Sequence, residues 1–367
     1  MQDDVGKTVR FLMRQVRRTH FARPEPRPSS REPVLYWEET CLGGSPYMVP
    51  LVILRTRPCR WFSAGGCVMC NYELLAVDEG VSDEDVLCQV ELAIEKLGPD
   101  LGKYPYLLLT SQGSFLDDEE VSQPLREKIL RKFWGAGLRA ISTESEARYC
   151  LDDDRLRSFK GSFPGRVSIG IGVEAANDFV RNSIINKGLP MHMLERAADT
   201  LAGRDFAFYT YISVGKPFLT PGEDVQDAVE AVLLSHKLGA FMAVLELINI
   251  QPHTLTERLW RAGRYSPCSL WSGIEILSRL PAELRSSTSV KGFDSDVQPV
   301  PLALPSGCQL CDSRLRTALN VWNLNRDFDQ LRNSVDECSC TLTFGAPIHD
   351  TSAIIRRVKS ELALFNA

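Results

Sequence analysis

Three cysteines lie close together in the first quarter of the chain, with the spacing C-x7-C-x2-C. They are Cys59, Cys67 and Cys70, and they directly follow the apolar run 48–54. A closed tetrahedral zinc site takes four ligands, so three thiolates are one too few for it. A [4Fe–4S] cluster also takes four ligands, normally all cysteine. Three cysteines would hold such a cluster with one iron left open for another ligand, and this open iron is the central hypothesis.

A second cysteine group lies near the C-terminus. It consists of a C-x2-C pair, Cys308 and Cys311, and a later C-x-C pair, Cys338 and Cys340. Four thiolates are enough to close a tetrahedral zinc site or to hold a second iron–sulfur cluster completely. Four free, buried cysteines are the plainer alternative. Because no ligand position stays open, a metal here would have a structural or electron-relay role, and the spacing favours neither zinc nor a cluster.

The elements that position these cysteines alternate between strands and helices from about residue 34. Six apolar runs have strand character, at 51–56, 106–110, 139–143, 167–173, 206–214 and 242–248. Helical patterns separate them, at 82–97, 118–134, 148–158, 176–202 (interrupted by Gly188 and Pro190) and 222–238. This alternation predicts an α/β fold with a parallel sheet covered by helices. An open doubly wound sheet and a partial barrel both fit, and both place chemistry at the C-terminal strand ends, as for the 59–70 loop.

Polar residues follow five strands in succession. They occupy 110–117, 143–145, 172–178, 213–218 and 246–253. A single carboxylate at a strand end is usually a helix cap or part of a surface ion pair. Because the ends of parallel strands meet at one edge of a sheet, five polar ends in a row instead predict a ligand cavity.

The two ends of the chain differ from this central region. Residues 1–33 form an Arg-rich arm in which Arg10, Arg14, Arg17 and Arg18 surround apolar positions, as in an amphipathic helix. The arm is either a basic element that contacts phosphate or a docking helix with a solvated face, and the acidic remainder favours docking. Residues 34–282 hold the alternating pattern, and 283–367 form a C-terminal region with the four-cysteine site, irregular over 283–306.

The composition limits the classes of function. The formal charge is −5, so the chain lacks the global basic field common in nucleic-acid-binding proteins. No apolar run has the length of a membrane span, and the N-terminus has no signal-peptide core. We therefore expect a cytoplasmic protein with no membrane partner, in which the eleven cysteines act as ligands and thiols rather than disulfides.

The first cysteine group, with the aromatic Tyr72 two residues beyond it, resembles the radical S-adenosylmethionine (SAM) enzymes. Their usual spacing is C-x3-C-x2-C, and the longer first gap here resembles the radical archaeosine synthase group and, more distantly, the elongator-type radical enzymes. The likeness extends over roughly 48–342, through 110–117, 143–145, 170–178, 185–188, 270–272 and the late cysteine pairs. It implies a partial (β/α)6 barrel of parallel strands, with an N-terminal extension and a small C-terminal cysteine-containing region.

The resemblance also implies roles for individual residues. Cys59, Cys67 and Cys70 would hold a [4Fe–4S] cluster whose open iron binds SAM. Reductive cleavage of SAM would give methionine and a 5′-deoxyadenosyl radical, which abstracts hydrogen from the substrate. Further SAM contacts are implied for the methionine part (Ser111, Gln112, Gly113), the amino group or ribose (Glu144, Glu174), the carboxylate (Lys187, Arg181), the adenine (Met69, Tyr72) and the adenine or substrate side (Asn249, Gln251).

For the substrate, the resemblance implies a modified nucleoside or an amino-acid adduct, with C–N bond cleavage as one outcome and a lyase or oxidoreductase type of reaction. An electron donor of the flavodoxin or ferredoxin type would be a partner. Transfer RNA is a candidate partner that the acidic charge does not favour. Two alternatives stay open: a radical SAM enzyme of small-molecule (natural product) biosynthesis, and a non-catalytic iron–sulfur or zinc protein.

Overall fold

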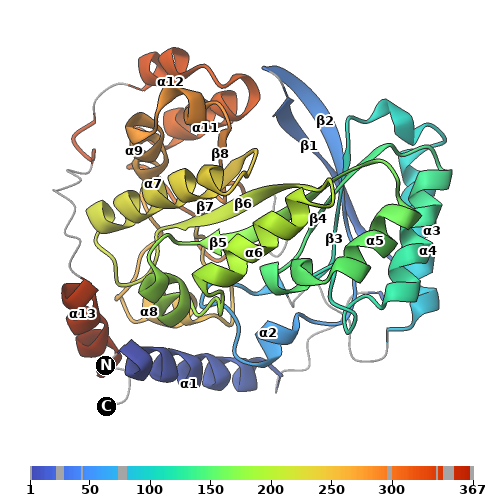
Figure 1. The fold of residues 1–367 in the computed structure, drawn as a ribbon. Helices are drawn as coiled ribbons and strands as arrows, with labels where there is room; N and C mark the ends of the chain where they lie inside the picture. The colour runs from blue at the N-terminus through green and yellow to red at the C-terminus, as the bar shows by residue number, and fades with distance from the viewer. Residues whose placement is uncertain are drawn as a thin grey trace.

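The computed structural model describes residues 2–21, 29–42, 44–72, 81–295, 300–335, 338–341 and 351–363. Eight strands form one sheet in the order of the chain, with β1 antiparallel to β2 and all other neighbours parallel. Figure 1 shows this sheet curled, with helices along its outer side. The strands are β1 (Val34–Leu42), β2 (Ser45–Ile53), β3 (Leu107–Thr110), β4 (Ala140–Glu144), β5 (Arg166–Glu174), β6 (Ala207–Val214), β7 (Ala243–Leu247) and β8 (Thr288–Lys291).

Helices connect the parallel strands and extend beyond the sheet at both ends of the chain. The α-helices are α1 (Gln2–Phe21), α2 (Arg60–Ser63), α3 (Asp83–Leu97), α4 (Gln123–Gly135), α5 (Asp153–Ser162), α6 (Met191–Ala202), α7 (Pro221–Lys237), α8 (Leu255–Arg261), α9 (Trp271–Arg279), α10 (Ala282–Arg285), α11 (Asp312–Asn325), α12 (Phe328–Ser334) and α13 (Thr351–Ala363). Short helices of other types are η2 (Leu101–Lys103), η3 (Ala147–Leu151) and the π-helix η4 (Val180–Ile184).

The partial parallel barrel expected from the sequence is confirmed. Its six predicted strands are present as β2 to β7, and the sheet stays open, because β1 and β8 form its two edges. The structure adds those two edge strands. The 283–306 segment, which the sequence analysis described as irregular, contributes β8 as a further parallel strand.

Local sequence signals explain most helix boundaries. Ser82 and Thr220 each begin a helix with a reciprocal capping box. The helix expected from residue 118 begins at Gln123, because the Ser122 side chain caps it. The helical region expected over 176–202 is interrupted as predicted, and it forms η4 and α6. Gly188, in the left-handed conformation, and Pro190 separate the two.

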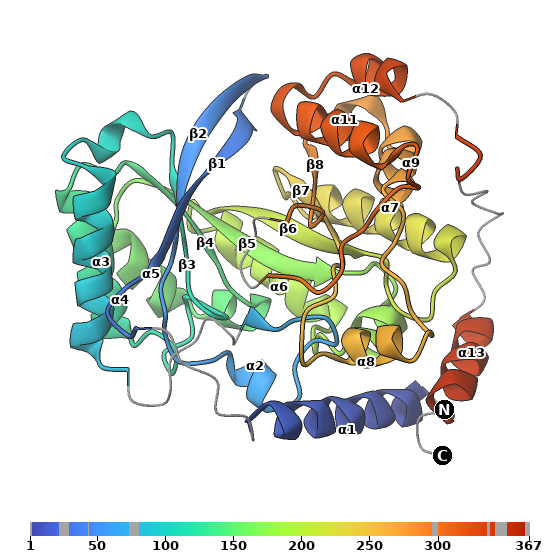
Figure 2. The same cartoon turned by 180° about the vertical axis from the view of Figure 1, so that it is seen from behind.

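Residues 2–21 of the N-terminal arm form one long helix, α1, that docks against the body of the protein. Its apolar face is buried against η4 and the cysteine loop, through Val5, Val9, Leu12, Met13 and Val16. Figure 2 shows α1 running beneath α2 and α8. The docking interpretation of this arm is therefore confirmed. Within the described part of the chain, none of the helices combines the length and the apolar character needed to cross a membrane.

Candidate functional site

One cavity of about 890 Å³ runs through the inside of the curled sheet. Of the fourteen residues that the sequence analysis assigns to the first site, thirteen line this cavity. They are Cys59, Cys67, Met69, Cys70, Tyr72, Ser111, Gln112, Gly113, Glu144, Glu174, Lys187, Asn249 and Gln251. They come from the ends of five parallel strands and the loops that follow. The sheet topology therefore brings together residues that span 193 positions of the sequence, from Cys59 to Gln251.

Arg181 is the exception, because it does not line the cavity. Its side chain is fully buried in η4, where the guanidinium donates to the carbonyl oxygens of Leu189 and Ala175 at 2.8 Å each. It also pairs with Asp178. These contacts hold η4 onto the end of β5, which is a structural role.

The loop that carries the three cysteines is held by its own backbone. Cys59 precedes α2, and a turn from Cys67 to Cys70 follows it, closed by the Cys70 amide donating to the Cys67 carbonyl at 3.2 Å. The Val68 amide donates to Ile185, and its carbonyl accepts from Leu255. These bonds tie the loop to the segments after β5 and β7, so the loop has a defined shape at the mouth of the cavity.

The three thiols line the cavity wall as neutral groups. Burial raises the pKa of Cys67 to about 12, and it raises the pKa values of Cys59 and Cys70 as well. A metal must therefore displace their protons on binding. The three sulfurs are not gathered within 4.8 Å of one another, unlike the C-terminal four. A cluster differs from a single ion in this respect, because each cysteine binds a different iron of the cube.

Gly113 brings the backbone after β3 against the first cysteine. A Cβ atom built on Gly113 would lie 2.6 Å from the Cβ of Cys59 and 2.6 Å from a carboxylate oxygen of Glu120. Next to it, the side-chain Nε2 of Gln112 donates to the Leu54 carbonyl at 3.0 Å, whereas its buried side-chain oxygen accepts no hydrogen bond from the described residues. That oxygen is an acceptor available to a ligand at the cavity wall.

Glu174 and Lys187 form an ion pair in the cavity. Their charged atoms lie 2.8 Å apart, and Ser213 donates to the other carboxylate oxygen at 2.7 Å. Glu174 has a left-handed backbone (φ 68°) at a β-bulge in β5, which turns its side chain inward. Burial lowers the pKa of Lys187, but Glu174, Cys67 and Glu146 together outweigh it, so the net shift of the pKa is upward and the ammonium stays charged.

The other predicted carboxylate and amides also have defined surroundings. Glu144 accepts hydrogen bonds from Tyr211 at 2.6 Å and from Thr110 at 2.8 Å. Gln251 donates to Asn249 at 2.7 Å. Met69 lines the wall between Cys67 and Cys70, and Tyr72 lines the cavity with about half (51%) of its surface accessible.

The structure adds cavity residues that the sequence analysis did not assign. They are contributed mainly by the sheet edges and the middle of the strands, and include Tyr36, Glu38, Tyr209, Tyr211, Glu246 and Lys291. Glu38 of β1 pairs with Lys291 of β8 across the two edges of the sheet. Burial raises the pKa of Glu246 to about 8, and no described residue donates a hydrogen bond to its carboxyl group. Glu246, a carboxylate inside the otherwise apolar strand AVLEL, belongs to the polar strand end 246–253 that predicts a ligand cavity, although no individual role was assigned to it.

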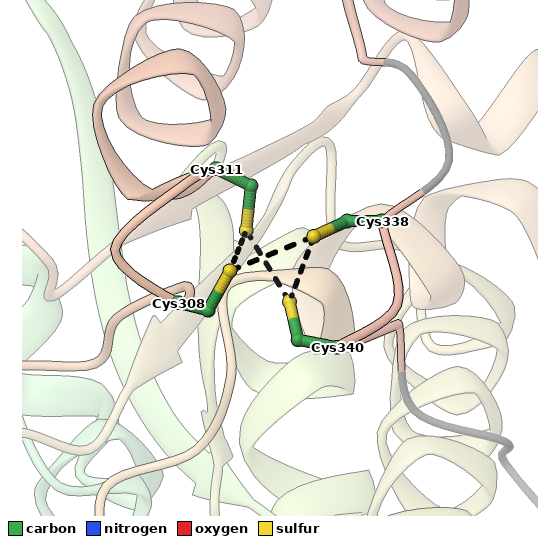
Figure 3. Close-up of side chains that lie close together, drawn as sticks. All are labelled: Cys308, Cys311, Cys338 and Cys340. Carbon is green, nitrogen blue, oxygen red and sulfur yellow. Dashed lines mark hydrogen bonds between the residues drawn. The ribbon is translucent and has the colours of Figure 1, made fainter.

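The C-terminal cysteines form a second, separate site. Figure 3 shows the four side chains pointing toward one another from the start of α11 and the 338–340 turn. The sulfur–sulfur distances are 3.6 Å for Cys308–Cys311, 3.5 Å for Cys308–Cys338, 3.3 Å for Cys311–Cys340 and 3.5 Å for Cys338–Cys340. All eleven cysteines of the chain are free of disulfides, as the sequence analysis expected. These four are therefore available as ligands.

Comparison with known proteins gives relatives along most of the chain. It is 27% identical over 354 residues to the archaeosine synthase subunit beta of Methanosarcina acetivorans, covering 92% of this chain and 98% of the relative. It is 30% identical over 314 residues to the protein of the same name from Thermococcus kodakarensis, covering 83% and 93%. No family model matches. A solved structure of Methanocaldococcus infernus Elp3 is a distant likeness, with a TM-score of 0.48 and 13% identity over 64% of this chain and 59% of that one.

Proposed function

The chain belongs to the family of archaeosine synthase beta subunits, and from this membership we propose that it is a radical SAM enzyme that acts on a modified nucleoside. The observation that supports this most is the convergence of thirteen predicted residues, three of them cysteines, on one cavity. A cluster that is only structural needs no such cavity. A cavity of this size with carboxylates, an ammonium group and amides on its wall is typical of a site that binds and transforms a small ligand.

The residues present fit the cofactors that this function requires. Cys59, Cys67 and Cys70 would hold a [4Fe–4S] cluster, and since no fourth cysteine is among the described residues of the cavity wall, one iron is left for SAM. The unpartnered oxygen of Gln112 and the space that Gly113 leaves beside Cys59 would receive the methionine part. When bound, the reduced cluster supplies the electron for SAM cleavage to methionine and a 5′-deoxyadenosyl radical that abstracts hydrogen from the substrate.

The protein's own side chains would bind and orient SAM and the substrate. Lys187 supplies a fixed positive charge to a ligand carboxylate. Glu174, held by Ser213, supplies a negative charge that pairs with a ligand ammonium group or accepts hydrogen bonds from ligand hydroxyls. The aromatic walls of Tyr36, Tyr209 and Tyr211 give the inner half of the cavity an apolar surface with hydroxyl groups on it. This surface suits a flat heterocycle.

An observation on α1 favours a nucleoside carried by RNA over a free metabolite. Lys7, Arg10, Arg14 and Arg18 lie on one face of the helix, because their spacing of three and four residues matches the helical repeat. We call these four residues the basic stripe. None of them pairs with a carboxylate of the described residues, and the stripe runs for about 16 Å at 1.5 Å per residue. A local stripe of this kind offers phosphate contacts on a chain whose overall charge is −5.

Formation of 5′-deoxyadenosine tests the proposed function. The anaerobically reconstituted protein, reduced and mixed with SAM, is expected to release 5′-deoxyadenosine, and Cys67→Ala is expected to abolish both iron binding and this product. Cys88→Ala is the control, because Cys88 lies on α3, outside the cavity. An absence of 5′-deoxyadenosine from fully loaded wild-type protein would contradict the proposal.

For the second site, we propose a single tetrahedral zinc ion with a structural role. A Zn–S bond of about 2.3 Å in a tetrahedron places the sulfurs roughly 3.8 Å apart. The sulfur–sulfur distances of 3.3–3.6 Å lie close to that value. They leave no room for a cube of four irons, in which each cysteine binds a separate iron. The site joins the start of α11 to the 338–340 turn, so an ion there would fix the C-terminal region on the sheet.

Metal analysis of a Cys308→Ser/Cys311→Ser variant tests this assignment. The variant is expected to lose one zinc per chain and to keep the iron and sulfide of the first site. Loss of iron and sulfide with no change in zinc would show instead that the four cysteines hold a cluster.

A further inference from the structure

Arg17 of α1 contacts the cysteine loop at Cys70. It belongs to α1, yet unlike its neighbours in the basic stripe it points inward, and only 3% of its surface is exposed. It does not line the cavity, so it has no place in SAM or substrate binding. A buried arginine needs good partners to offset the loss of water.

The guanidinium of Arg17 bridges two loops that both face the cavity. One terminal nitrogen donates to the carbonyl oxygen of Cys70, and the other donates to the carbonyl of His253 at 2.9 Å. The second nitrogen also lies 3.5 Å from the side-chain oxygen of Asn71. Cys70 is the last of the three cysteines, and His253 follows β7, so one side chain fixes the end of the cysteine loop against a distant strand end.

The same group is also stacked on the loop. Its central carbon lies 3.5 Å from the ring centre of Phe62, in α2 between Cys59 and Cys67. Gly66 leaves the space for this arrangement, because a Cβ there would lie 3.4 Å from the Arg17 nitrogen and 3.1 Å from the Phe62 backbone. Arg17 thus contacts the loop both before and after Cys67. A planar, forked donor is needed for this, and the single ammonium of lysine cannot replace it fully.

We infer that Arg17 is a positioning residue for the [4Fe–4S] cluster of the proposed function. It would hold Cys70 and the turn before it in the shape that binds iron, and it places a fixed positive charge beside the Cys70 carbonyl. Hydrogen bonds and charge around an iron–sulfur cluster raise or lower its reduction potential. A positive charge favours the reduced state, so loss of Arg17 should make the cluster harder to reduce.

Hydrogen exchange of the metal-free protein tests the positioning role without depending on the cluster. In Arg17→Gln, the amides of 66–71 are expected to exchange about tenfold faster or more, while those of β5 stay as protected as in the wild type. Arg17→Lys should show a smaller effect. Arg196→Gln is the control, because Arg196 is an exposed arginine on α6. Unchanged exchange over 66–71, with β5 intact, would overturn the inference.

Iron binding and reduction potential give the second readout. Outer contacts of metal ligands typically contribute 10–100-fold to metal affinity, so Arg17→Gln is expected to lose iron to a chelator faster by about that factor. The remaining cluster should have a more negative midpoint potential. If Arg17→Gln does not fold, Phe62→Leu replaces it, because it removes the stacking surface and keeps the charge. If SAM is not cleaved by any variant, the proposed function fails, but the exchange result still decides the role of Arg17.

Discussion

Gly113 occupies a position at which two functional segments touch. The backbone after β3 approaches Cys59 so closely that no side chain fits between them. Gly113→Ala is therefore expected to push Cys59 away, since its Cα and Cβ would lie 2.9 and 2.6 Å from the new methyl group. We expect loss of most of the bound iron and of 5′-deoxyadenosine formation, measured as iron and sulfide per chain and by chromatography.

Gly135→Ala is the matched control for this change. A Cβ at Gly135, the last residue of α4, meets no atom within 4 Å. Alanine there should keep iron binding and stabilise the protein slightly, by about 0.4–1 kcal/mol. Full iron loading of Gly113→Ala would show that the loop can move, and the close contact would then have no role in forming the site.

Glu246 provides a prediction about pH. Burial, together with the nearby carboxylates of Glu38, Glu174 and Glu144, raises its pKa from 4.5 to about 8 against the opposing charge of Lys291. Between pH 4.5 and about pH 8, the Glu246 carboxyl group is ionised in the unfolded chain and protonated in the folded protein. Its contribution to stability is thus complete below pH 4.5 and is lost as the pH rises to about 8. Glu246→Gln removes the titrating group, so the melting temperature of the metal-free variant should exceed that of the wild type increasingly from pH 5 to 8. Parallel melting curves would contradict the shift.

At the scale of elements, the strands were predictable where their composition was distinctive. β3 to β7 are apolar runs buried between helices and cavity, and their ends carry the polar residues that mark the site. β1, VLYWEETCL, carries the polar run Glu38–Thr40 between its apolar ends, and β8 has only four residues, TSVK. Both are edge strands, and pairing with a neighbour rather than local composition determines them. No local pattern could have placed them in the sheet.

Docking of α1 is an element-scale property with its own test. Leu12 is 1% exposed and belongs to one apolar cluster with Val68 of the cysteine loop and Val180 of η4. Leu12→Ala is expected to remove about 2–5 kcal/mol of packing, enough to release the helix from the loop before the sheet unfolds. Hydrogen exchange of α1 and of 66–71 should then increase together.

Phe11→Ala controls for the loss of a large side chain from the same helix. Phe11 is 54% exposed and lies outside the buried face, so its removal should leave exchange of the loop unchanged. If Leu12→Ala frees α1 without affecting the loop, the helix is an attachment and has no part in shaping the site.

At the scale of the whole molecule, the site was predictable because the ends of parallel strands meet at one edge. Ser111 and Gln251 lie far apart in sequence, yet both line the cavity, as that topology requires. Contacts between the two edge strands of the open sheet, β1 and β8, could not be predicted in the same way. Glu38 and Lys291 are 253 residues apart and sit on the two edge strands, and Arg17 reaches the site from a helix that precedes the sheet. Each of these depends on how complete elements pack.

The basic stripe leads to a prediction about the substrate's carrier. If RNA phosphates lie along α1, the affinity for transfer RNA should fall steeply with salt concentration, since each neutralised phosphate releases counterions. Arg14→Gln/Arg18→Gln should weaken binding for all sequences alike and reduce the slope of log affinity against log salt by about two. Filter binding of a transfer RNA transcript between low and physiological salt measures both quantities.

Arg196→Gln/Lys237→Gln is the control with the same change of charge. Both residues are exposed, on α6 and α7, and lie outside the stripe. If the basic stripe is the docking surface, this variant should keep the wild-type slope of log affinity against log salt, because the two substituted residues do not contact RNA phosphates. Equal losses in the two double variants would mean that binding follows net charge alone. Failure of the wild type to bind, with 5′-deoxyadenosine formation stimulated by a free nucleoside, would assign the cavity a small-molecule substrate and leave α1 its role beside Cys70.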